Sequence, residues 1–211
     1  MSQTGFWKFL PQEATQLILS SATYFDYKRH DKIYTAGDVP KGIYVIKAGL
    51  VGLVALTPKG SEHLLRLFKP NDFFGHRSYF AKELHHANSI CLEPSSIGLV
   101  NPEIIEKVLV DFPSTQRILI ETLAKELGIA ELQRIRVTDQ EVLQRIASAL
   151  IYLKEIHPNH NWTRSEIAQF CASTTPTIIR GLAELEKQKM IKQIGRQIEI
   201  SNRNALILLS N

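Results

Sequence analysis

The sequence predicts an α+β protein: a strand-rich, antiparallel N-terminal part, then a long helix, then a compact helical part with a β-hairpin. Two residue patterns predict this order. From about residue 23 to residue 100, short runs of β-branched and aromatic residues alternate with turn residues, which is typical of antiparallel sheets. Beyond residue 101, apolar residues recur at helical spacing until two short strand-like runs appear near the end.

The composition is that of a globular protein with material for one or two domains. Of 211 residues, 44% are hydrophobic and 22% are charged, which excludes wholesale disorder. The 25 Lys and Arg against 21 Asp and Glu give a net charge of +4, which permits an acidic partner. Two cysteines, Cys91 and Cys171, exclude a disulfide framework and a multi-cysteine metal site, so we expect a reduced, cytoplasmic protein.

No stretch reaches the roughly 18 apolar residues that a membrane helix needs. Residues 50–56 are typical of the longest uncharged apolar runs. Residues 1–12 lack a basic segment followed by an apolar one, so we expect neither a signal peptide nor membrane association.

The N-terminal elements are a short helix near residues 11–19 and a series of strands. The runs with strand character are residues 43–46, 50–56, 64–68 and 97–100. Turn formers such as Gly and Pro separate these runs. Short strands at near-regular spacing favour a sandwich or barrel of antiparallel strands.

A long helix is expected over residues 113–137, with Pro113 in its first turn. Its apolar residues Ile120, Leu123, Leu127 and Ala130 follow the 3-4-3 spacing of a coiled coil, which predicts a dimer interface. A second apolar edge of Leu119, Ile129 and Leu132 fits the alternative, in which the helix lies on its own domain.

A new helix is expected to start near Thr138, because Thr138 and Glu141 have the spacing of a capping box, and to end near residue 156. Two helices joined without a long loop suggest a hinge at residues 137–140. The expected domains are therefore residues 1–112, a dimerisation helix over 113–137, and residues 138–211.

Two short helices and a hairpin follow. Thr163 and Glu166 form a second capping-box pattern, residues 171–173 are a small-residue turn, and Thr174 is placed to cap a helix over 175–189. Strand-like runs at 190–194 and 197–200 flank Gly195-Arg196. This order is a helix-turn-helix with a hairpin wing, an arrangement that binds DNA. A three-helix bundle without nucleic acid is the alternative, and 9 basic against 7 acidic residues over 138–211 separate the two only weakly.

The chain as a whole resembles the CRP/FNR family of transcription regulators. The motif Thr-Arg-Ser-Glu-Ile-Ala at residues 163–168 is similar to the family's helix-turn-helix entry. Pro-Asn-Asp-Phe-Phe-Gly at residues 70–75 resembles its Pro-Gly-Asp-x-Phe-Gly turn, with Asn71 at a position where a left-handed backbone is tolerated. The resemblance implies an N-terminal β-roll of the double-stranded β-helix type, a dimerisation helix and a C-terminal winged helix-turn-helix.

The resemblance implies that Arg180 reads a guanine, because its planar fork can hold O6 and N7 together. Pro176 and Ile179 depart from the residues of many relatives, so the half-site should differ around that guanine. Arg164, Lys192 and Arg196 are expected to hold phosphates, although Arg180 could instead pair with Glu184 on its own helix. The full set of expected DNA-binding residues is Arg164, Thr174, Thr175, Pro176, Thr177, Arg180, Lys192 and Arg196.

Relatives that bind cyclic nucleotides carry Gly-Glu after the 70–75 turn and an arginine about ten residues later. Here these positions read Gly75-His76 and His86-Ala87, and a neutral histidine cannot replace the charged fork of arginine. We therefore expect no ordinary cyclic AMP response and no fixed cofactor or metal. The remaining pocket either meets another anion or is vestigial, and a haem role is weakly supported by His85, His86, His76 and Cys91. The expected pocket residues are Gly75, His76, Arg77, Ser78, His86 and Ala87.

The first hypothesis is a bacterial, homodimeric regulator that binds double-stranded DNA at an inverted repeat and, if it activates, contacts RNA polymerase. The second is a ligand-binding or protein-interaction module, such as a haem or small-anion sensor, whose C-terminal helices mediate assembly. No catalytic motif is present, so the chain is not expected to be an enzyme.

Overall fold

The computed structural model describes residues 9–58 and 60–210, so most of the 1–12 segment examined for a signal peptide lies outside it. The chain divides into two compact units. The N-terminal unit comprises residues 1–60 and 65–129, and the C-terminal unit comprises residues 61–64 and 130–211. Among the described helices, none is long and apolar enough to cross a membrane.

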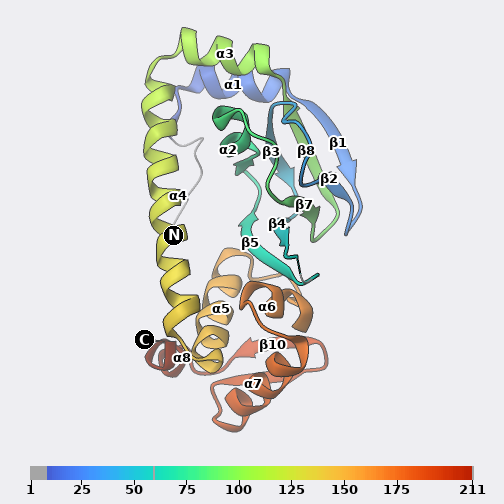
Figure 1. The fold of residues 1–211 in the computed structure, drawn as a ribbon, viewed down its shortest axis with the longest axis vertical. Helices are drawn as coiled ribbons and strands as arrows, with labels where there is room; N and C mark the ends of the chain where they lie inside the picture. Colours follow the sequence, from blue (N-terminus) through green and yellow to red (C-terminus); the bar gives the residue numbers. More distant parts are fainter. Residues whose placement is uncertain (1–8, 59, 211) are drawn as a thin grey trace. The chain divides into compact units, whose positions relative to one another are not determined.

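Two four-stranded antiparallel sheets form the N-terminal unit (Figure 1). The first has the order β1-β8-β3-β6, with bounds Thr23–Tyr27, Ser95–Val100, Ile43–Ala48 and Phe73–Phe74. The second has the order β2-β7-β4-β5, with bounds Lys32–Tyr34, Asn88–Cys91, Val51–Leu56 and Glu62–Phe68. The predicted antiparallel β part is thus confirmed, with four short strands that the sequence did not single out.

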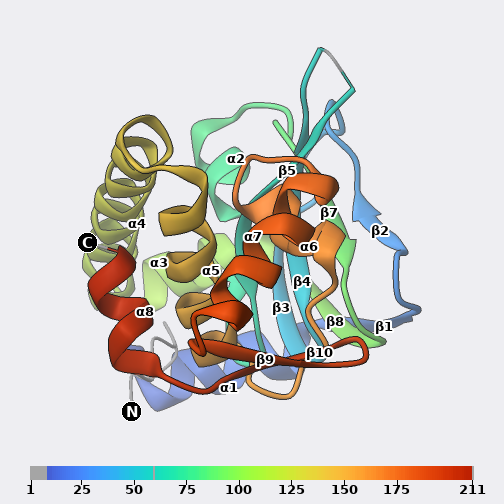
Figure 2. The same ribbon diagram turned by 90° about the horizontal axis from the view of Figure 1, so that it is seen from below.

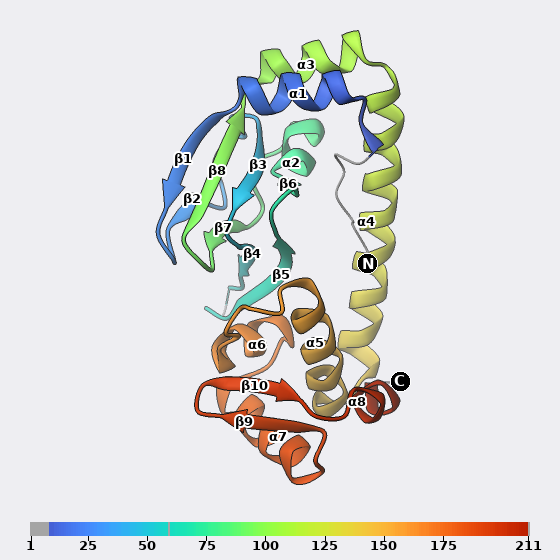
Figure 3. The ribbon, with the colours of Figure 1, turned by 180° about the vertical axis from the view of Figure 1, so that it is seen from behind.

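Four helices accompany these sheets: α1 (Gln12–Ser21), α2 (His76–Ala81), α3 (Pro102–Asp111) and the first part of α4 (Ser114–Asp139). Figure 3 shows α1 and α3 side by side across the ends of the first sheet, and α1 contacts both α3 and β8. Strand β3 is therefore buried on both faces. Tyr44 and Ile46 belong to the core cluster with Phe68 and Phe74, while Val45 belongs to the cluster with residues of α1 and α3.

The 70–75 turn has the backbone that its sequence predicts. Asn71 has a φ of 72° and Gly75 a φ of 82°, both in the left-handed region. Asp72 lies between them and accepts a hydrogen bond from the Lys69 amide at 2.9 Å. Gly75 then precedes α2, so the turn determines where that helix begins.

The C-terminal unit contains α5 (Val142–Ile156), α6 (Arg164–Phe170), α7 (Thr175–Lys187), the hairpin β9 (Ile191–Ile194) and β10 (Gln197–Ile200), and α8 (Arg203–Ser210). Figure 2 shows the hairpin beside α7, and α8 packs against α5. The core side chains are fully buried and come from every helix: Ile146, Leu150, Leu153, Ile167, Ile178, Leu182, Leu185 and Leu206. The predicted helix-turn-helix with a hairpin is confirmed.

The helix break near residue 140 differs from the prediction in one detail. Thr138 caps no new helix, because it lies inside α4 and its hydroxyl donates to the Ile135 carbonyl at 2.8 Å. Glu141 is the cap instead, and it forms a capping box with Gln144. A glutamate side chain can accept a hydrogen bond from the same backbone amides as a threonine. The cap of the new helix therefore lies three residues after the expected position.

Candidate nucleic-acid interface

Helix α6 begins at the capping box that the sequence predicts. The Thr163 hydroxyl accepts from the Glu166 amide at 3.1 Å, and the Glu166 carboxylate accepts from the Thr163 amide at 2.8 Å. Glu166 also contacts the buried His160 ring at 3.3 Å. Burial alone would raise the pKa of Glu166, but the hydrogen bonds from His160 and Thr163 outweigh it and lower the pKa. The start of α6 is therefore anchored by a buried, charged network.

The tight turn after α6 brings α7 close to α5. Ala172 has a left-handed φ of 49°, and the Ser173 amide donates to the Ala168 carbonyl at 2.9 Å. Gly181 on α7 has no Cβ, and an added Cβ would collide with Ile146 of α5. Close packing on α5 leaves the opposite side of α7 exposed.

That opposite side begins at a capped N-terminus. The Thr174 side chain accepts from the Thr177 amide, and the two threonine hydroxyls lie 2.9 Å apart. Pro176 lies in the first turn, where a missing amide hydrogen costs little. Pro176, Ile179 and Arg180 are exposed. The expected DNA-reading residues thus share one solvent-facing end of α7.

Arg180 extends from this face, and its guanidinium makes one long hydrogen bond within the protein. One guanidinium nitrogen donates to the Thr177 hydroxyl at 3.4 Å. Its alternative partner, Glu184, accepts instead from the Gln188 side chain at 2.7 Å. The fork of Arg180 is therefore presented to solvent rather than occupied by the carboxylate one turn along.

Arg164 holds the hairpin. Its guanidinium donates to the Arg196 carbonyl at 2.5 Å and to the Gln193 side chain at 2.7 Å. Gln193 in turn donates two hydrogen bonds to the Glu186 carboxylate of α7, from its backbone amide at 2.6 Å and from its side-chain amide at 3.0 Å. This network connects the first turn of α6, the end of α7 and the hairpin, so the hairpin has a defined position on the helices.

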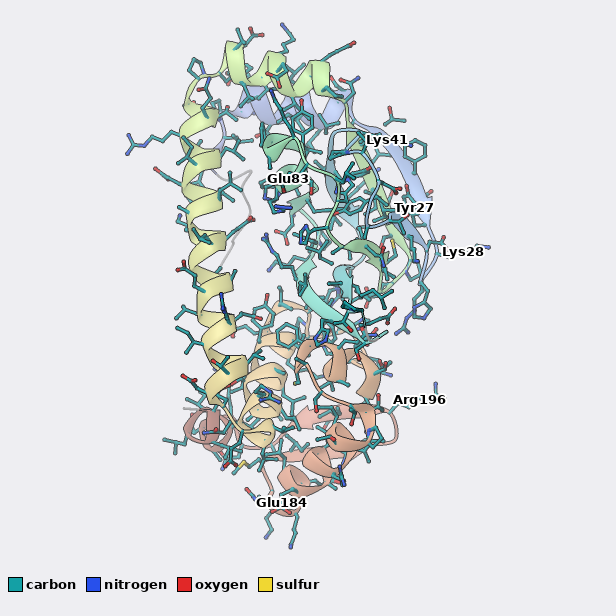
Figure 4. All side chains as sticks on the ribbon, viewed as in Figure 1. Tyr27, Lys28, Lys41, Glu83, Glu184 and Arg196 are labelled. Atoms are coloured by element: carbon teal, nitrogen blue, oxygen red, sulfur yellow. The ribbon has the colours of Figure 1, made fainter. Side chains whose placement is uncertain are left out.

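Lys192 and Arg196 are the basic residues that the hairpin exposes. Lys192 lies opposite Glu199 in the β9–β10 register. Arg196 follows Gly195, whose φ is 59°, and its side chain extends away from the unit (Figure 4). Arg196 is thus exposed at the tip of the hairpin.

Arg145 connects the end of α4 to the turn of the helix-turn-helix. Its guanidinium donates to the Gln140 carbonyl at 2.7 Å and to the Cys171 carbonyl at 3.1 Å. The last carbonyls of a helix carry partial negative charge, so a cation stabilises them. The predicted hinge segment is therefore held by one side chain of α5.

A charged cluster in the N-terminal unit includes one of the expected pocket residues. His76, which is buried in α2, lies 3.0 Å from the Glu126 carboxylate of α4, and Arg66 of β5 donates to the same carboxylate at 2.6 Å. Burial alone would raise the pKa of Glu126, but the hydrogen bonds from Arg66 and His76 lower it to about 2. Glu126 is consequently ionised at neutral pH.

The other expected pocket residues are placed around α2 and the segment before β7. Ser78 and Ala87 are buried, whereas His86 is exposed. Arg77 is paired with Glu83, labelled in Figure 4, through two contacts of 3.0 and 2.9 Å. Burial and the charge of Arg77 lower the pKa of His86.

The structure brings two further residues, Glu126 and Arg66, together with His76, which is one of the expected pocket residues. Neither was evident in the sequence, because each lies 50 to 60 residues from its partner. One sequence signal was available for Glu126: it lies two helical turns after Leu119, so the two residues share a face of α4. Leu119 is buried, and Glu126 therefore belongs to the face that packs on the N-terminal unit. The ring of His85, which the sequence suggested for a haem role, is stacked on the ring of Tyr34 with 3.6 Å between the centroids. Among the residues described, no group of three side chains could hold a metal ion.

The expected dimer face of α4 is open in the single chain. Ile120 and Leu127 are 67% and 61% exposed. Ala130 is also exposed, whereas Leu123 packs partly against the N-terminal core. Of the four residues in the predicted stripe, Ile120 and Leu127 are thus the large apolar side chains that remain exposed to solvent.

Each of the two units contains a segment that matches a known protein-family domain. Residues 24–111 match the cyclic nucleotide-binding domain, and residues 144–209 match the Crp-like helix-turn-helix domain. The chain is 21% identical over 215 residues to a "CRP-like cAMP-activated global transcriptional regulator" of Mycobacterium tuberculosis, covering 98% of this chain and 96% of that protein. It is also 30% identical over 119 residues to an uncharacterised protein of Haemophilus influenzae, covering 56% of this chain and 91% of that one.

Among solved structures, FixK2 from Bradyrhizobium japonicum has a TM-score of 0.80 and 24% sequence identity, with 90% of this chain and 98% of that chain covered. The two domains in this order define a DNA-binding transcription regulator rather than an enzyme. The chain belongs to the CRP/FNR family.

Proposed function

We propose that this regulator is a homodimer that reads an inverted-repeat operator through the exposed N-terminal end of α7. The observation that carries the proposal is the presentation of Arg180, which is exposed and has Thr177 rather than Glu184 as its partner. A bidentate contact with guanine would contribute about 1–3 kcal/mol of discrimination at one base pair of each half-site.

The surrounding residues divide into two roles. Thr174, Thr175, Pro176 and Thr177 form the end of the helix that enters the groove, and its amides favour a phosphate nearby. Lys192 and Arg196 contact the backbone without reading sequence. Arg164 acts mainly as a positioning residue, because its guanidinium donates to the hairpin.

The dimer forms along α4, with Ile120 and Leu127 at its centre. Two copies related by a two-fold axis would present their α7 helices to successive major grooves about 34 Å apart. Such a protein works in the cytoplasm on genomic DNA, and it contacts RNA polymerase if it activates.

Cyclic AMP is not the effector in this proposal, although a similar protein is named for its activation by it. His76 and His86 occupy the positions where such relatives carry glutamate and arginine. The nearby arginines already have carboxylate partners, since Arg66 pairs with Glu126 and Arg77 pairs with Glu83. An ionised Glu126 would also repel a cyclic phosphate. Isothermal titration should detect no binding in the micromolar range, and tight binding would refute this part of the proposal.

An electrophoretic shift against fragments of the source genome separates the two functions that the chain could have. A regulator selects discrete fragments that contain inverted repeats and releases unrelated DNA in the presence of competitor. An assembly module, the second candidate, would retain no fragment selectively, and that result would overturn the proposal.

A further inference from the structure

Helix α7 presents one continuous face to solvent. The side of the helix that packs on the rest of the unit consists of Ile178, Leu182 and Leu185, each fully buried. The exposed residues recur at helical spacing on the other side, and we call them the exposed stripe of α7: Pro176, Ile179, Arg180, Ala183 and Lys187.

Both acidic residues of α7 lie outside this stripe and have partners. Glu184 accepts a hydrogen bond from the Gln188 side chain at 2.7 Å, and Glu186 accepts its two hydrogen bonds from Gln193 of the hairpin. The stripe therefore carries the cations Arg180 and Lys187 together with apolar side chains, and no anion. Such a surface is complementary in charge to the phosphate-lined groove of DNA.

Ile179 is the large apolar side chain of the stripe, and it is 54% exposed. A single exposed apolar residue is ordinary on a protein surface, so its neighbours decide what it can contact. Ile179 directly precedes Arg180, and consecutive Cα atoms lie about 3.8 Å apart, close to the ~3.4 Å between successive bases of a strand. An Arg180 that holds a guanine would therefore place Ile179 at the edge of a nearby base pair.

The chemistry of the isoleucine side chain restricts which base it can recognise. Ile179 has no hydrogen-bond donor or acceptor, so it distinguishes bases by apolar contact alone. In the major groove, the edge of thymine presents a 5-methyl group, whereas the other bases present hydrogen-bonding groups. Pro176, one turn earlier on the stripe, likewise offers no side-chain hydrogen bond.

We propose that Ile179 is a specificity-determining residue that contacts the 5-methyl group of a thymine within about two base pairs of the guanine held by Arg180. This inference rests on the proposed function, and it adds a base that Arg180 alone would not select. Ile179 distinguishes thymine from uracil, which differ in the methyl group and share every base-pairing atom.

The probe is the operator duplex that the full-length chain selects from a random DNA pool. Each symmetric pair of thymines is replaced by uracil in turn, and fluorescence anisotropy measures the affinity of each duplex. Replacement of one pair near the guanine should lower the affinity about 15-fold. This value corresponds to roughly fourfold for each half-site, the ratio that burial of one methyl group supplies.

Variants of exposed isoleucines identify the residue responsible. Ile179→Ser removes the apolar contact, so the thymine and uracil duplexes should bind this variant equally well. Ile179→Val keeps a branched apolar side chain and should keep the preference for thymine. Ile194→Ser is the matched control, because Ile194 is 46% exposed on the hairpin, and it should keep the full preference.

Equal affinity of the wild type for the thymine and all uracil duplexes would overturn the inference and leave the proposed function standing, because an operator is still selected. Retention of the thymine preference by Ile179→Ser would also overturn it. Selection of no operator would refute the proposed function and this inference together.

Discussion

Arg180 and Arg196 both expose a guanidinium, but their surroundings predict different effects on DNA binding. Arg180 belongs to the exposed end of α7, whereas Arg196 extends from the hairpin tip. Arg180→Ala should flatten the preference at one symmetric base pair, with a loss of about 1–3 kcal/mol on the preferred operator alone. Arg196→Ala should weaken binding to all DNA sequences alike. It should also reduce the slope of log affinity against log salt concentration by about 1, because one phosphate contact is lost. Fluorescence anisotropy on operator variants at several salt concentrations measures both effects. Unchanged selectivity in Arg180→Ala would remove it from base recognition.

Asp72 is a half-buried residue whose carboxyl pKa is raised to about 6, chiefly by its partial burial. Its ordinary pKa is 3.8, so the folded state holds this proton up to a higher pH than the unfolded state does. Stability therefore falls as pH rises from about 4 to 6 and stays lower above that range. Asp72→Asn keeps an acceptor for the Lys69 amide and removes the half-buried charge. It should raise the free energy of unfolding by about 1–3 kcal/mol at pH 7, with the gain disappearing near pH 4.

Asp38 provides the matched control for Asp72. It accepts similar hydrogen bonds from Thr35, at 2.8 Å from the amide and 3.0 Å from the hydroxyl, and these bonds lower its pKa. Asp38→Asn should therefore not stabilise the protein at neutral pH. Urea unfolding at pH 4, 5, 6 and 7 compares the two variants, and an Asp72→Asn gain that persists at pH 4 would argue against a half-buried charge.

At the scale of elements, Arg145 is the side chain that joins α4, α5 and the turn before α7. Arg145→Met keeps the apolar stem and removes the hydrogen bonds to the Gln140 and Cys171 carbonyls. The loss should be about 1.5–3 kcal/mol in the stability of the C-terminal unit. Hydrogen exchange at residues 137–141 should become faster, because the hinge loses its cation.

Arg203→Met is the control for this change. Arg203 forms a 3.4 Å ion pair with Glu155 in which both side chains are more than half exposed. Exposed pairs of this kind contribute little, so the variant should lose less than about 0.5 kcal/mol. Equal effects of Arg145→Met and Arg203→Met would show that the segment at 137–141 is held by other contacts.

The elements that could be predicted from sequence are those whose signals are local. Thr163 and Glu166 are three residues apart, and their capping box starts α6 where expected. Strands β1 and β7 were missed, since β1 is mostly exposed and β7 contains Asn88 and Ser89 instead of a continuous apolar run. The pairing of Glu126 with Arg66 and His76 depends on how a helix packs across a sheet, which residue spacing does not encode.

At the scale of the whole molecule, the dimer interface should depend on the exposed apolar residues of α4. Leu123 is a poor test position because it packs partly in the N-terminal core. Ile120→Glu combined with Leu127→Glu changes two residues seven positions apart, which share one face of the helix. Light scattering should report monomers, and DNA affinity should fall at least about 100-fold because half-sites are no longer bound together.

Ile129→Glu combined with Leu132→Glu is the matched control on the second apolar edge. These side chains are 59% and 58% exposed, so the same apolar surface is removed from another side of α4. The dimer should persist in this variant. An intact dimer in the first variant would place the interface elsewhere.

Selection of bound sequences from a random DNA pool tests most directly whether the chain is a dimeric reader of DNA. The full-length wild-type protein, selected at moderate salt and followed by sequencing, should enrich an inverted repeat. Its half-sites should lie one helical turn apart, with a symmetric guanine in each. Enrichment of no motif, or of a single asymmetric motif that the Ile120→Glu, Leu127→Glu variant binds equally well, would contradict the proposed function.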